Sequence, residues 1–482
     1  MTRPNVLLVV LDAVRARNTT LHGHDNDTTP FLATLADEAT VYEQARAPGT
    51  ESISSHTSLF TGLHVREHRI TNRRHRLEPG HTVWERLASN RGYDTGVFSN
   101  NPFLTELPVG LSDAFETIYG RSEELPYPDG VNPKDFVIER DDGPRKYLDF
   151  LRAAAASDRP LGSLVNGLSF KLPDRYERRL PAAFRAEPSA ERYADFFLEW
   201  HAERDGPWAA CLNFMDAHFP YAPGEYDQWG GPELARLQDD LDDQVWEFVG
   251  GERPWWQRRA LEALYDGAVR RMDAQVGRLV ETLARRDDLE NTLLVVTADH
   301  GEGFGERSLV RPDERLVGHG NGGVDEELLH VPLVVRPPGG DGEGGRVVDE
   351  PASLTRFPAV VEAYVEGESE TFVPEGPVVA STDGIDPDTQ ERASRHRSVL
   401  EPLTRPADAV YEAGDGGVRK FVRWGDRELA VAIRGATAAW VTDEGVDRVG
   451  DVVDGMDDAS VGASAESVDA DVKQRLEDLG YA

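Results

Sequence analysis

The sequence predicts an α/β protein in which a layered sheet, with helices on both faces, precedes a smaller antiparallel sheet. Three observations predict it. Continuous apolar runs of strand length recur along the chain, as expected for strands that are covered on both faces. Helical patterns alternate with these runs, which is typical of a mostly parallel sheet. After residue 340 the composition changes, and "AVYEAGDGGVRKFVRWGDRELAVAI" (409–433) predicts short antiparallel strands joined by Gly-rich turns.

The expected elements can be placed in order along the chain. They are a strand at 5–11, a helix at 28–39, a helix followed by a strand within 82–101, a strand at 208–214, a helix at 268–286, and strands at 291–297 and 331–335. In the first helix Thr29 is the expected cap and Pro30 occupies the first turn, where proline is tolerated. Gly92 is expected to end the second helix, and the helix at 268–286 has one apolar face.

The chain of 482 residues is long enough for two units with a sizeable core. We expect a large domain at 1–340 and a C-terminal domain at 341–482, with the Gly-rich stretch "PPGGDGEGG" (337–345) at their boundary. The second domain is expected to hold the small sheet and a closing helix at 469–482. Residues 105–205 interrupt the alternation, and we interpret them as an insertion able to act as a lid.

The charge of the chain is strongly acidic, with 87 Asp and Glu against 52 Lys and Arg, a net charge of −35. Only five of the basic residues are lysines. Such a composition is typical of salt-adapted, archaeal-type proteins, because concentrated salt screens the self-repulsion. It argues against nonspecific binding to nucleic acid or to an anionic membrane. The single Cys211 excludes an intrachain disulfide, and with no signal peptide or membrane span in the sequence we expect a cytoplasmic location.

Polar side chains follow three of the expected buried strands. Asp12 follows the first, Asp216 and His218 follow the strand at 208–214, and Asp299 and His300 follow the strand at 291–297. The carboxyl ends of parallel strands are where ligands bind in open α/β sheets. Carboxylates and imidazoles gathered there suit a divalent cation, so we expect a metal or catalytic site at this edge. For Asp216 two readings stay open, a ligand of a second metal ion or a structural acceptor.

Several ordered blocks resemble the sulfatase family of the alkaline-phosphatase-like superfamily. They are "PNVLLVVLDAVRA", "TTPFLATLADEATVYEQARAPG", "SLFTGLHVREH", "NFMDAHFPYAP" and "NTLLVVTADHGEGFGE". The resemblance spans residues 4–101 and about 206–340, with a weaker similarity at the C-terminus. Because the blocks occur in one order along the chain, the resemblance is more specific than any single motif.

The resemblance implies a three-layer α/β/α sandwich, a smaller C-terminal antiparallel sheet, and hydrolysis of sulfate or phosphate esters. It assigns the role of catalytic domain to residues 1–340. Asp12, Asp299 and His300 resemble the ligands of one divalent metal ion, which the sequence leaves open as calcium, magnesium, manganese or zinc. His218 resembles the histidine that contacts the substrate.

The nucleophile is implied by the stretch "APGTESISSHTSLFTGL" (47–63). Sulfatases have a Cys or Ser, oxidised to formylglycine, ahead of a block similar to "SLFTG" (58–62). Aligning the two blocks without a gap places Ser52 at the modified position. A helix that begins there would favour an anion, because its first N–H groups are free and its dipole is positive. Thr50 is the alternative nucleophile if the alignment shifts by two residues.

The chain departs from the family pattern at three positions. His56 occupies the position of the usual Arg, Ser54 that of the usual Pro or Ala, and Ala13 follows Asp12 where a second Asp is usual. The signal for modification is therefore incomplete, so whether Ser52 becomes formylglycine stays open. As an unmodified hydroxyl, Ser52 would be a further metal ligand. We include His56 and Thr50 with Ser52 and His218 among the candidate catalytic residues.

The expected mechanism is an in-line attack on a small anionic ester. His218 and His319, the latter in the Gly-rich "VGHGNGG", would bind the anion or protonate the leaving group. The substrate would be a sulfated or phosphorylated sugar, aryl compound or lipid headgroup. Sulfate-ester hydrolysis is the first hypothesis, a phosphodiesterase or phosphotransferase with unmodified Ser52 or Thr50 the second, and non-catalytic anion binding the third.

Overall fold

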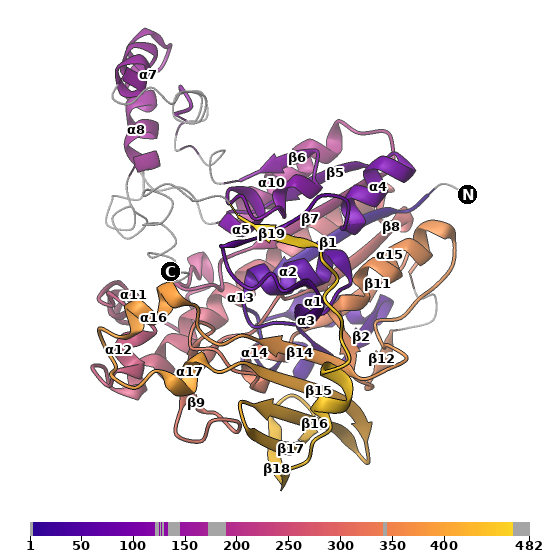
Figure 1. Ribbon diagram of the computed structural model, residues 1–482. Coiled ribbons are helices and arrows are strands. Elements are labelled where there is room, and N and C mark those ends of the chain that lie inside the picture. The colour runs from indigo at the N-terminus through magenta and orange to yellow at the C-terminus, as the bar shows by residue number, and fades with distance from the viewer. Residues whose placement is uncertain are drawn as a thin grey trace.

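A large sheet forms the centre of the protein in the computed structural model, which describes residues 3–120, 125, 127, 130–133, 145–171, 189–340 and 345–465. The sheet has eight strands (Figure 1). In spatial order they are β12 (Arg346–Val348), β2 (Thr40–Tyr42), β11 (Leu333–Arg336), β8 (Thr292–Thr297), β1 (Asn5–Leu11), β7 (Trp208–Phe214), β5 (Asp94–Phe98) and β6 (Thr117–Tyr119).

The sheet is mostly parallel, as predicted. β1 lies at its middle and pairs in parallel with β7 and β8, so that Leu8 faces Cys211 on one side and Val295 on the other. β11 runs antiparallel to its neighbours β2 and β8. Every residue of β1, β7 and β8 is buried, which explains why these strands have apolar sequences without alternation.

Helices cover both faces of the sheet, which confirms the α/β/α arrangement (Figure 1). On one face α13 (Trp255–Arg285) packs against α1 (Pro30–Leu35) and α10 (Ser189–Ala202). On the other face α2 (Ser52–Thr61) packs against α4 (Val83–Arg91) and α15 (Phe357–Glu366).

The ends of the predicted helices differ in how well they match. The Thr82 hydroxyl accepts from the Glu85 amide and the Glu85 carboxylate accepts from the Thr82 amide, so α4 begins with a capping box. It ends before Gly92, whose φ of 69° is left-handed. The α-helix predicted at 28–39 is shorter, and Thr29 does not cap it, because its hydroxyl accepts from the Thr20 amide instead.

A separate five-stranded antiparallel sheet confirms the expected smaller sheet. Its strands are β14 (Val378–Thr382), β15 (Ala407–Gly414), β16 (Gly417–Trp424), β17 (Arg427–Arg434) and β18 (Ala438–Glu444). Beyond it the chain forms α18 (Val449–Val453) and then returns to the N-terminal part of the chain, where β19 (Gly462–Ser464) pairs with β4 (His75–Leu77). The closing helix predicted at 469–482 lies outside the described residues.

The predicted insertion 105–205 contributes to two parts of the molecule. β6 and α10 belong to the sheet and to one of its helical layers, whereas α7 (Arg145–Ala156) and α8 (Pro160–Lys171) pack on each other and project from the body (Figure 1). A lid function for this stretch stays a prediction. No helix among the described residues is long and apolar enough to cross a membrane.

The remaining short elements connect these layers. They are β3 (Ala45–Arg46), α3 (Val65–His68), α5 (Pro102–Thr105), α11 (Pro232–Asp239), α12 (Trp246–Val249), β9 (Gly303–Arg307), β10 (Arg315–Gly318), α14 (Glu326–Leu329), β13 (Ala352–Ser353), α16 (Pro387–Ala393) and α17 (Glu401–Thr404).

Candidate active site and metal centre

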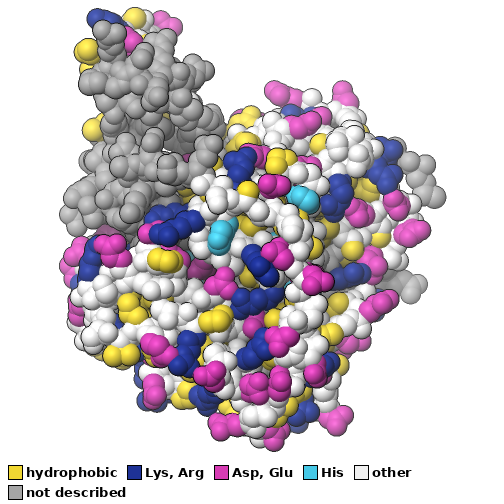
Figure 2. Space-filling view, in the orientation of Figure 1, with side chains coloured by type: hydrophobic (Ala, Val, Ile, Leu, Met, Phe, Trp, Pro, Cys, Tyr) yellow, Lys and Arg dark blue, Asp and Glu magenta, His cyan; other side chains and the backbone are white. Residues whose placement is uncertain are grey.

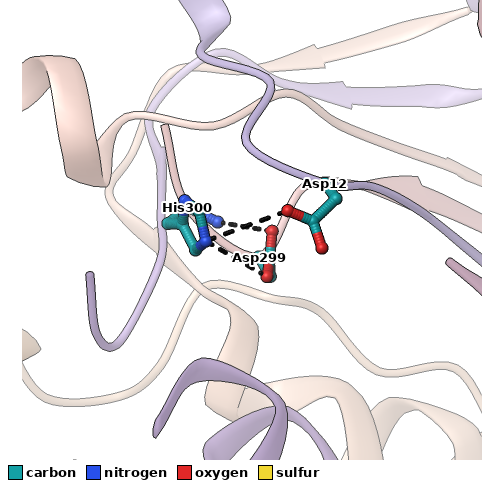
Figure 3. A group of neighbouring side chains, drawn as sticks. All are labelled: Asp12, Asp299 and His300. Carbon is teal, nitrogen blue, oxygen red and sulfur yellow. Dashed lines mark hydrogen bonds and ion pairs between the residues drawn. The ribbon is translucent and has the colours of Figure 1, made fainter. Parts of the chain in front are cut away.

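The carboxyl ends of β1 and β8 bring together three side chains that the sequence separates widely. Val10 of β1 pairs with Thr297 of β8, so Asp12 and Asp299 each lie two residues beyond the same level of the sheet. Asp12, Asp299 and His300 converge with their ligand atoms within 4.8 Å of one another (Figure 3). All three are fully buried.

One oxygen of Asp12 is held by two amide side chains that sequence reasoning missed. Asp12 Oδ2 accepts hydrogen bonds from Asn101 Nδ2 at 3.0 Å and from Asn213 Nδ2 at 3.1 Å. Asn101 follows β5 and Asn213 lies in β7, so neighbouring strands orient the carboxylate. Asp12 Oδ1 accepts no hydrogen bond within the described residues. A polar residue inside the apolar run "WAACLNF" was the signal for Asn213.

Asp299 is arranged in the same way, with one oxygen held and the other available. Its Oδ1 accepts from the backbone amides of Ala13 at 3.2 Å and His300 at 3.0 Å. Its Oδ2 accepts no hydrogen bond within the described part of the chain. Buried carboxylate oxygens usually have partners, so one such atom on each aspartate indicates a ligand between them.

His300 completes the set through its Nε2 atom. The Nδ1 atom lies 3.0 Å from the Gly301 carbonyl, to which it donates, so Nε2 keeps its lone pair. Nε2 lies 3.5 Å from Asp299 Oδ2 and 4.0 Å from Asp12 Oδ1. Two carboxylate oxygens and one imidazole nitrogen therefore face one another, and these donors fit a single divalent cation.

The electrostatics of the cluster point the same way. Burial and the nearby Asp299 charge raise the pKa of Asp12 to about 6. Burial opposes ionisation of Asp299 and His300 as well, but their mutual attraction outweighs it, so the pKa of Asp299 is lowered and that of His300 is raised. A divalent cation between the two carboxylates would relieve the repulsion of Asp12 by Asp299 and would take the place of the proton on His300.

Ser52 lies at the first position of α2, next to this cluster. The preceding residue, Glu51, has an extended backbone, and the helix begins at Ser52, which is fully buried. Its Oγ atom lies 3.4 Å from His300 Nε2. The first amides of a helix lack intrahelical acceptors, so the hydroxyl shares its surroundings with free N–H groups that favour an anion.

His56 lies one turn along α2 from Ser52. Its Nδ1 atom lies 2.9 Å from the Ser52 carbonyl, to which it donates, and 3.6 Å from Asp299 Oδ2. The ring is fully buried and packs edge-on against Phe60. Its Nε2 atom makes no hydrogen bond within the described residues. The cluster therefore has an imidazole at the position where the family pattern has a guanidinium.

His218 and His319 form the next layer around the cluster. The His319 ring centroid lies 4.3 Å from that of His300 and 4.9 Å from that of His218. Burial lowers the pKa of both His218 and His319 to about 4, so both rings are neutral near pH 7. Two neutral imidazoles beside a metal site are suited to hold a substrate oxygen or to transfer a proton.

Glu302 holds His319 in place and was not among the predicted residues. Glu302 Oε2 accepts from His319 Nδ1 at 3.1 Å, while Oε1 accepts from Arg258 Nη2 at 2.6 Å and from the Tyr221 hydroxyl at 2.8 Å. Glu302 and Arg258 are fully buried. An acidic residue two positions after His300 was the available signal in the sequence, although its partners are remote in the chain.

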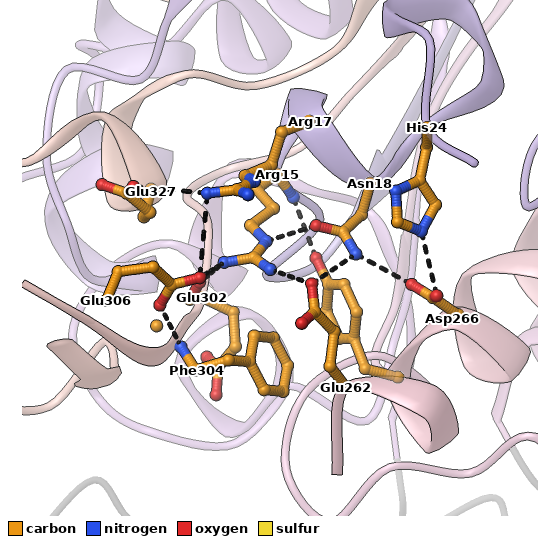
Figure 4. A network of polar contacts seen from close by, with 12 residues as sticks. Arg15, Arg17, Asn18, His24, Glu262, Asp266, Glu302, Phe304, Glu306 and Glu327 are labelled. Carbon is orange, nitrogen blue, oxygen red and sulfur yellow. Dashed lines mark hydrogen bonds and ion pairs between the residues drawn. The ribbon is translucent and has the colours of Figure 1, made fainter. Parts of the chain in front are cut away.

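The loop after β1 is held by a second buried arginine (Figure 4). Arg15 donates to the Glu302 carbonyl at 3.0 Å and to the Glu306 carboxylate at 2.7 Å, and it also contacts Asn18. The loop needs this support because Ala13 has a φ of 61°, which is unfavourable for a residue other than glycine.

Two candidate residues do not join the cluster. Thr50 lines a cavity of about 240 Å³, and no hydrogen bond or ion pair links it to the cluster within the described residues. Asp216 accepts from the Ala190 amide at 2.9 Å, at the start of α10, and lies 3.4 Å from Arg271 Nε. Asp216 therefore has the contacts of a helix cap and of an ion pair.

Comparison with known proteins identifies relatives of the whole scaffold. A family model described as Sulfatase matches residues 4–363. The ulvan-active sulfatase of Formosa agariphila is 24% identical over 384 residues, covering 78% of this chain and 63% of that protein. The N-acetylglucosamine-6-O-sulfatase of Bacteroides thetaiotaomicron is 22% identical over 369 residues, covering 70% of this chain and 63% of that protein. The matches thus span less than two thirds of these two relatives.

A solved structure has the same fold. The phosphonate monoester hydrolase of Agrobacterium radiobacter aligns with a TM-score of 0.58 and 21% identity, and the alignment covers 89% of each chain. At this identity the likeness shows the fold.

Proposed function

The chain belongs to the sulfatase family, and on that premise we propose that it is a metal-dependent hydrolase that cleaves sulfate esters by in-line attack from residue 52. The observation that carries the proposal is the position of Ser52. Its hydroxyl lies 3.4 Å from His300 Nε2, at the beginning of α2 and beside the three groups that fit a divalent cation. The proximity of the candidate nucleophile, the three candidate metal ligands and a helix N-terminus supports the proposal.

Asp12, Asp299 and His300 would hold one divalent ion, with Ser52 as a further ligand. Such an ion would neutralise charge on the ester oxygens and lower the pKa of the hydroxyl. An imidazole in the set favours manganese or zinc over calcium and magnesium, which prefer oxygen ligands. Elemental analysis of the purified protein, prepared with each metal in turn, would identify the ion.

The remaining steps fall to side chains around the ester. The free amides at the start of α2 would bind the transferring group and orient it for attack from the opposite side of the leaving oxygen. His218 and His319 would hydrogen-bond the anion or protonate the leaving group, with Glu302 fixing the ring of His319. His56 would fix the position of the Ser52 backbone relative to Asp299, because its Nδ1 atom donates to the Ser52 carbonyl and lies near Asp299 Oδ2.

The test begins with the chemical state of Ser52. Trypsin releases the peptide Ala47–Arg66, and conversion of Ser52 to formylglycine would lower its mass by two hydrogens. This lower mass, together with hydrolysis of an aryl sulfate, is the expected result for a sulfatase. An intact serine combined with turnover of an aryl phosphate diester and none of the sulfate would contradict it. A protein that retains no divalent ion and turns over neither ester would be a non-catalytic anion-binding member of the family.

A second candidate function is favoured by His56. With an imidazole at the usual Arg position, the signal for modification is incomplete, so Ser52 would stay a hydroxyl, with Thr50 as the alternative nucleophile. An unmodified hydroxyl beside a metal ion would attack a phosphodiester, or transfer a phosphoryl group to an acceptor. The peptide mass separates this reading from the first.

The substrate would be a small sulfated sugar, with aryl and lipid-headgroup esters as alternatives. The two sulfatase relatives act on ulvan and on N-acetylglucosamine-6-O-sulfate by their names, which supports a carbohydrate ester. Hydrolysis of a panel of sulfated monosaccharides would rank the leaving groups. The division at residue 340, the absence of a nucleic-acid partner and the cytoplasmic location stay predictions from the sequence.

We also propose that the protein works in concentrated salt. The net charge is −35, and Figure 2 shows acidic side chains spread over the visible face with Lys and Arg between them. Salt would screen their repulsion and stabilise the folded state. The unfolding midpoint should therefore rise as potassium chloride is added, and a midpoint that falls with salt would contradict this proposal.

A further inference from the structure

A cavity adjoins the beginning of α2 and includes the two residues that come directly before Ser52. Its volume is about 240 Å³, and Thr50 and Glu51 contribute to its lining. Asp383 and Asp386, from the segment between β14 and α16, contribute as well. Pockets for drug-sized ligands measure about 300–1,000 Å³, so this cavity suits a single sugar ring or a smaller molecule.

Thr50 and Glu51 each bring a polar side chain without a partner to this cavity. Thr50 has only 1% of its surface exposed, yet its hydroxyl makes no hydrogen bond within the described residues. Glu51 is partly buried, and its carboxylate makes neither a hydrogen bond nor an ion pair in the described part of the chain. Buried polar groups usually have partners, so two such groups at one cavity indicate a ligand.

The charge of the lining is negative. Besides His75, the charged side chains that line the cavity in the described residues are three carboxylates, with neither Lys nor Arg. Asp383 pairs with Arg66, which lies outside the lining, and Asp386 caps α16, so Glu51 is the carboxylate that lacks a partner. Burial and the charges of Asp386 and Asp383 raise the pKa of Glu51 to about 8, and a cation beside it would favour its ionised form.

The cavity lies close to the candidate metal centre. Glu51 precedes Ser52 in the chain, and the charge of His300 partly offsets the rise in the pKa of Glu51, so the two side chains are near each other. The overall acidity of the protein does not account for Glu51, because charges that keep a protein dispersed in salt lie in water, whereas this carboxylate is partly buried. Carboxylates beside a site for an anionic ester favour a substrate whose other end is positive.

We propose that this cavity binds the leaving group of the substrate, and that the leaving group carries a primary ammonium group held by Glu51. The inference rests on the proposed function, because it takes the ester to lie at Ser52. A primary ammonium group donates three hydrogen bonds, for which the Glu51 carboxylate and the Thr50 hydroxyl are acceptors. A quaternary ammonium group fits less well, since it prefers aromatic faces and the described lining has no ring other than that of His75. Amino sugars and amino alcohols share the required chemistry.

The test compares two sulfate esters that differ in one group. Glucosamine 6-sulfate carries an ammonium group where glucose 6-sulfate carries a hydroxyl. The kcat/KM of the full-length wild type should be at least about tenfold higher for the glucosamine ester, because a charge-assisted hydrogen bond is stronger than a neutral one. The assay is run in concentrated potassium chloride, since salt screens partly buried charges less than exposed ones.

A third ester separates the two sources of the ammonium group. If 2-aminoethyl sulfate is cleaved with a kcat/KM as high as that of glucosamine 6-sulfate, the ammonium group belongs to an amino alcohol. If its kcat/KM is much lower, the sugar ring is needed and the substrate is an amino sugar. Both results support the ammonium site.

The variant that tests the site is Glu51→Gln, which keeps the shape of the side chain and removes its charge. It should reduce the ratio of the kcat/KM values for glucosamine 6-sulfate and glucose 6-sulfate to about one. The matched control is Glu233→Gln on α11, which removes a charge from a side chain that is 78% exposed, and it should keep the wild-type ratio. Neither substitution breaks a buried contact, so neither should lower the unfolding midpoint.

Equal kcat/KM values of the wild type for the two sugar esters, or a wild-type ratio in Glu51→Gln, would overturn the inference. The proposed function is judged separately with an aryl sulfate, which has no amine. A wild type that cleaves the aryl sulfate without preferring glucosamine 6-sulfate contradicts the ammonium site alone. If the wild type cleaves no sulfate ester, calorimetry with the same two sugar esters takes the place of kinetics. Tighter binding of glucosamine 6-sulfate that is lost in Glu51→Gln would then support the site, and equal binding would overturn it.

Discussion

The buried pair formed by Glu302 and Arg258 makes a quantitative prediction about the support of the active site. Both side chains are fully buried, and the two charged groups lie 2.6 Å apart. Burial by itself would raise the pKa of Glu302, but the hydrogen bond from His319 and the charge of Arg258 reverse this and lower it from 4.5 to about 2. A difference of this size corresponds to about 3 kcal/mol of folding free energy at neutral pH.

The perturbation is Glu302→Gln, which keeps the shape of the side chain and removes its charge. The free energy of unfolding at pH 7 should fall by about 3 kcal/mol, because Arg258 would be left as a buried charge without its carboxylate. The ionised Glu302 stabilises the folded state above its ordinary pKa of 4.5, and this stabilisation is lost as the pH falls towards 2. The difference between wild type and variant should therefore shrink below pH 4.5.

The assay is urea denaturation of the wild type, Glu302→Gln, Arg258→Met and the double variant. Each single substitution leaves the other residue buried without its partner. The double variant should therefore lose less free energy of unfolding than the sum of the two single losses, with a coupling energy of about 2 kcal/mol. A loss of less than about 1 kcal/mol in Glu302→Gln, or strict additivity in the double variant, would refute the reasoning.

Three further predictions concern the metal, the nucleophile and a buried histidine. Elemental analysis of Asp12→Asn should find no bound divalent ion. A chelator should lower the unfolding midpoint of the wild type but not of this variant, because an ion present at a hundred times its Kd stabilises the folded state by about 3 kcal/mol. A wild-type midpoint that does not change with the chelator would contradict the metal site. Ser52→Ala should abolish turnover while Thr50→Ala stays within about tenfold of wild type, and the reverse result would assign the nucleophile to Thr50. His68 donates to Ser58 Oγ through Nε2 and accepts from the Ile70 amide through Nδ1, and burial lowers its pKa to about 3. The folded state favours the neutral form of His68, so the protein is destabilised as the pH falls below the ordinary histidine pKa of 6.5. Between pH 7 and pH 5 the free energy of unfolding of His68→Gln should therefore fall by about 2 kcal/mol less than that of the wild type. Identical changes in the free energy of unfolding with pH would count against this.

The strands were the most predictable part of the fold. The runs at 5–11 and 208–214 are strands over those residues, because strands covered on both faces by helices have to be apolar throughout. Short pairings were not predictable. β19 returns from the end of the described chain to pair with β4, and only the placement of both segments brings Gly462 opposite Leu77. Such a pairing leaves no periodic signal in the sequence, since each strand has three residues.

The candidate metal ligands of the site were predictable from the sequence, but the residues that support them were not. Asp12, Asp299 and His300 each follow a recognisable strand, and parallel strands end at one edge of the sheet, so their proximity follows from the order of elements. Glu302 and Arg258 belong to segments 44 residues apart, and no spacing rule links them. Their pairing depends on how α13 lies against the loop after β8.

The sequence by itself determined the α/β class, the family, the edge of the sheet where the candidate site lies and the stretch that holds the candidate nucleophile, because each of these depends on local pattern and on the order of elements along the chain. The tertiary structure decided which oxygens of Asp12 and Asp299 are held and which are available, that His319 is oriented by Glu302, and that Glu51 lines one cavity with Asp383 and Asp386. The physical reason is that hydrogen-bond partners and burial depend on contacts between segments remote in the chain. A residue type can limit these contacts, but only packing selects among them.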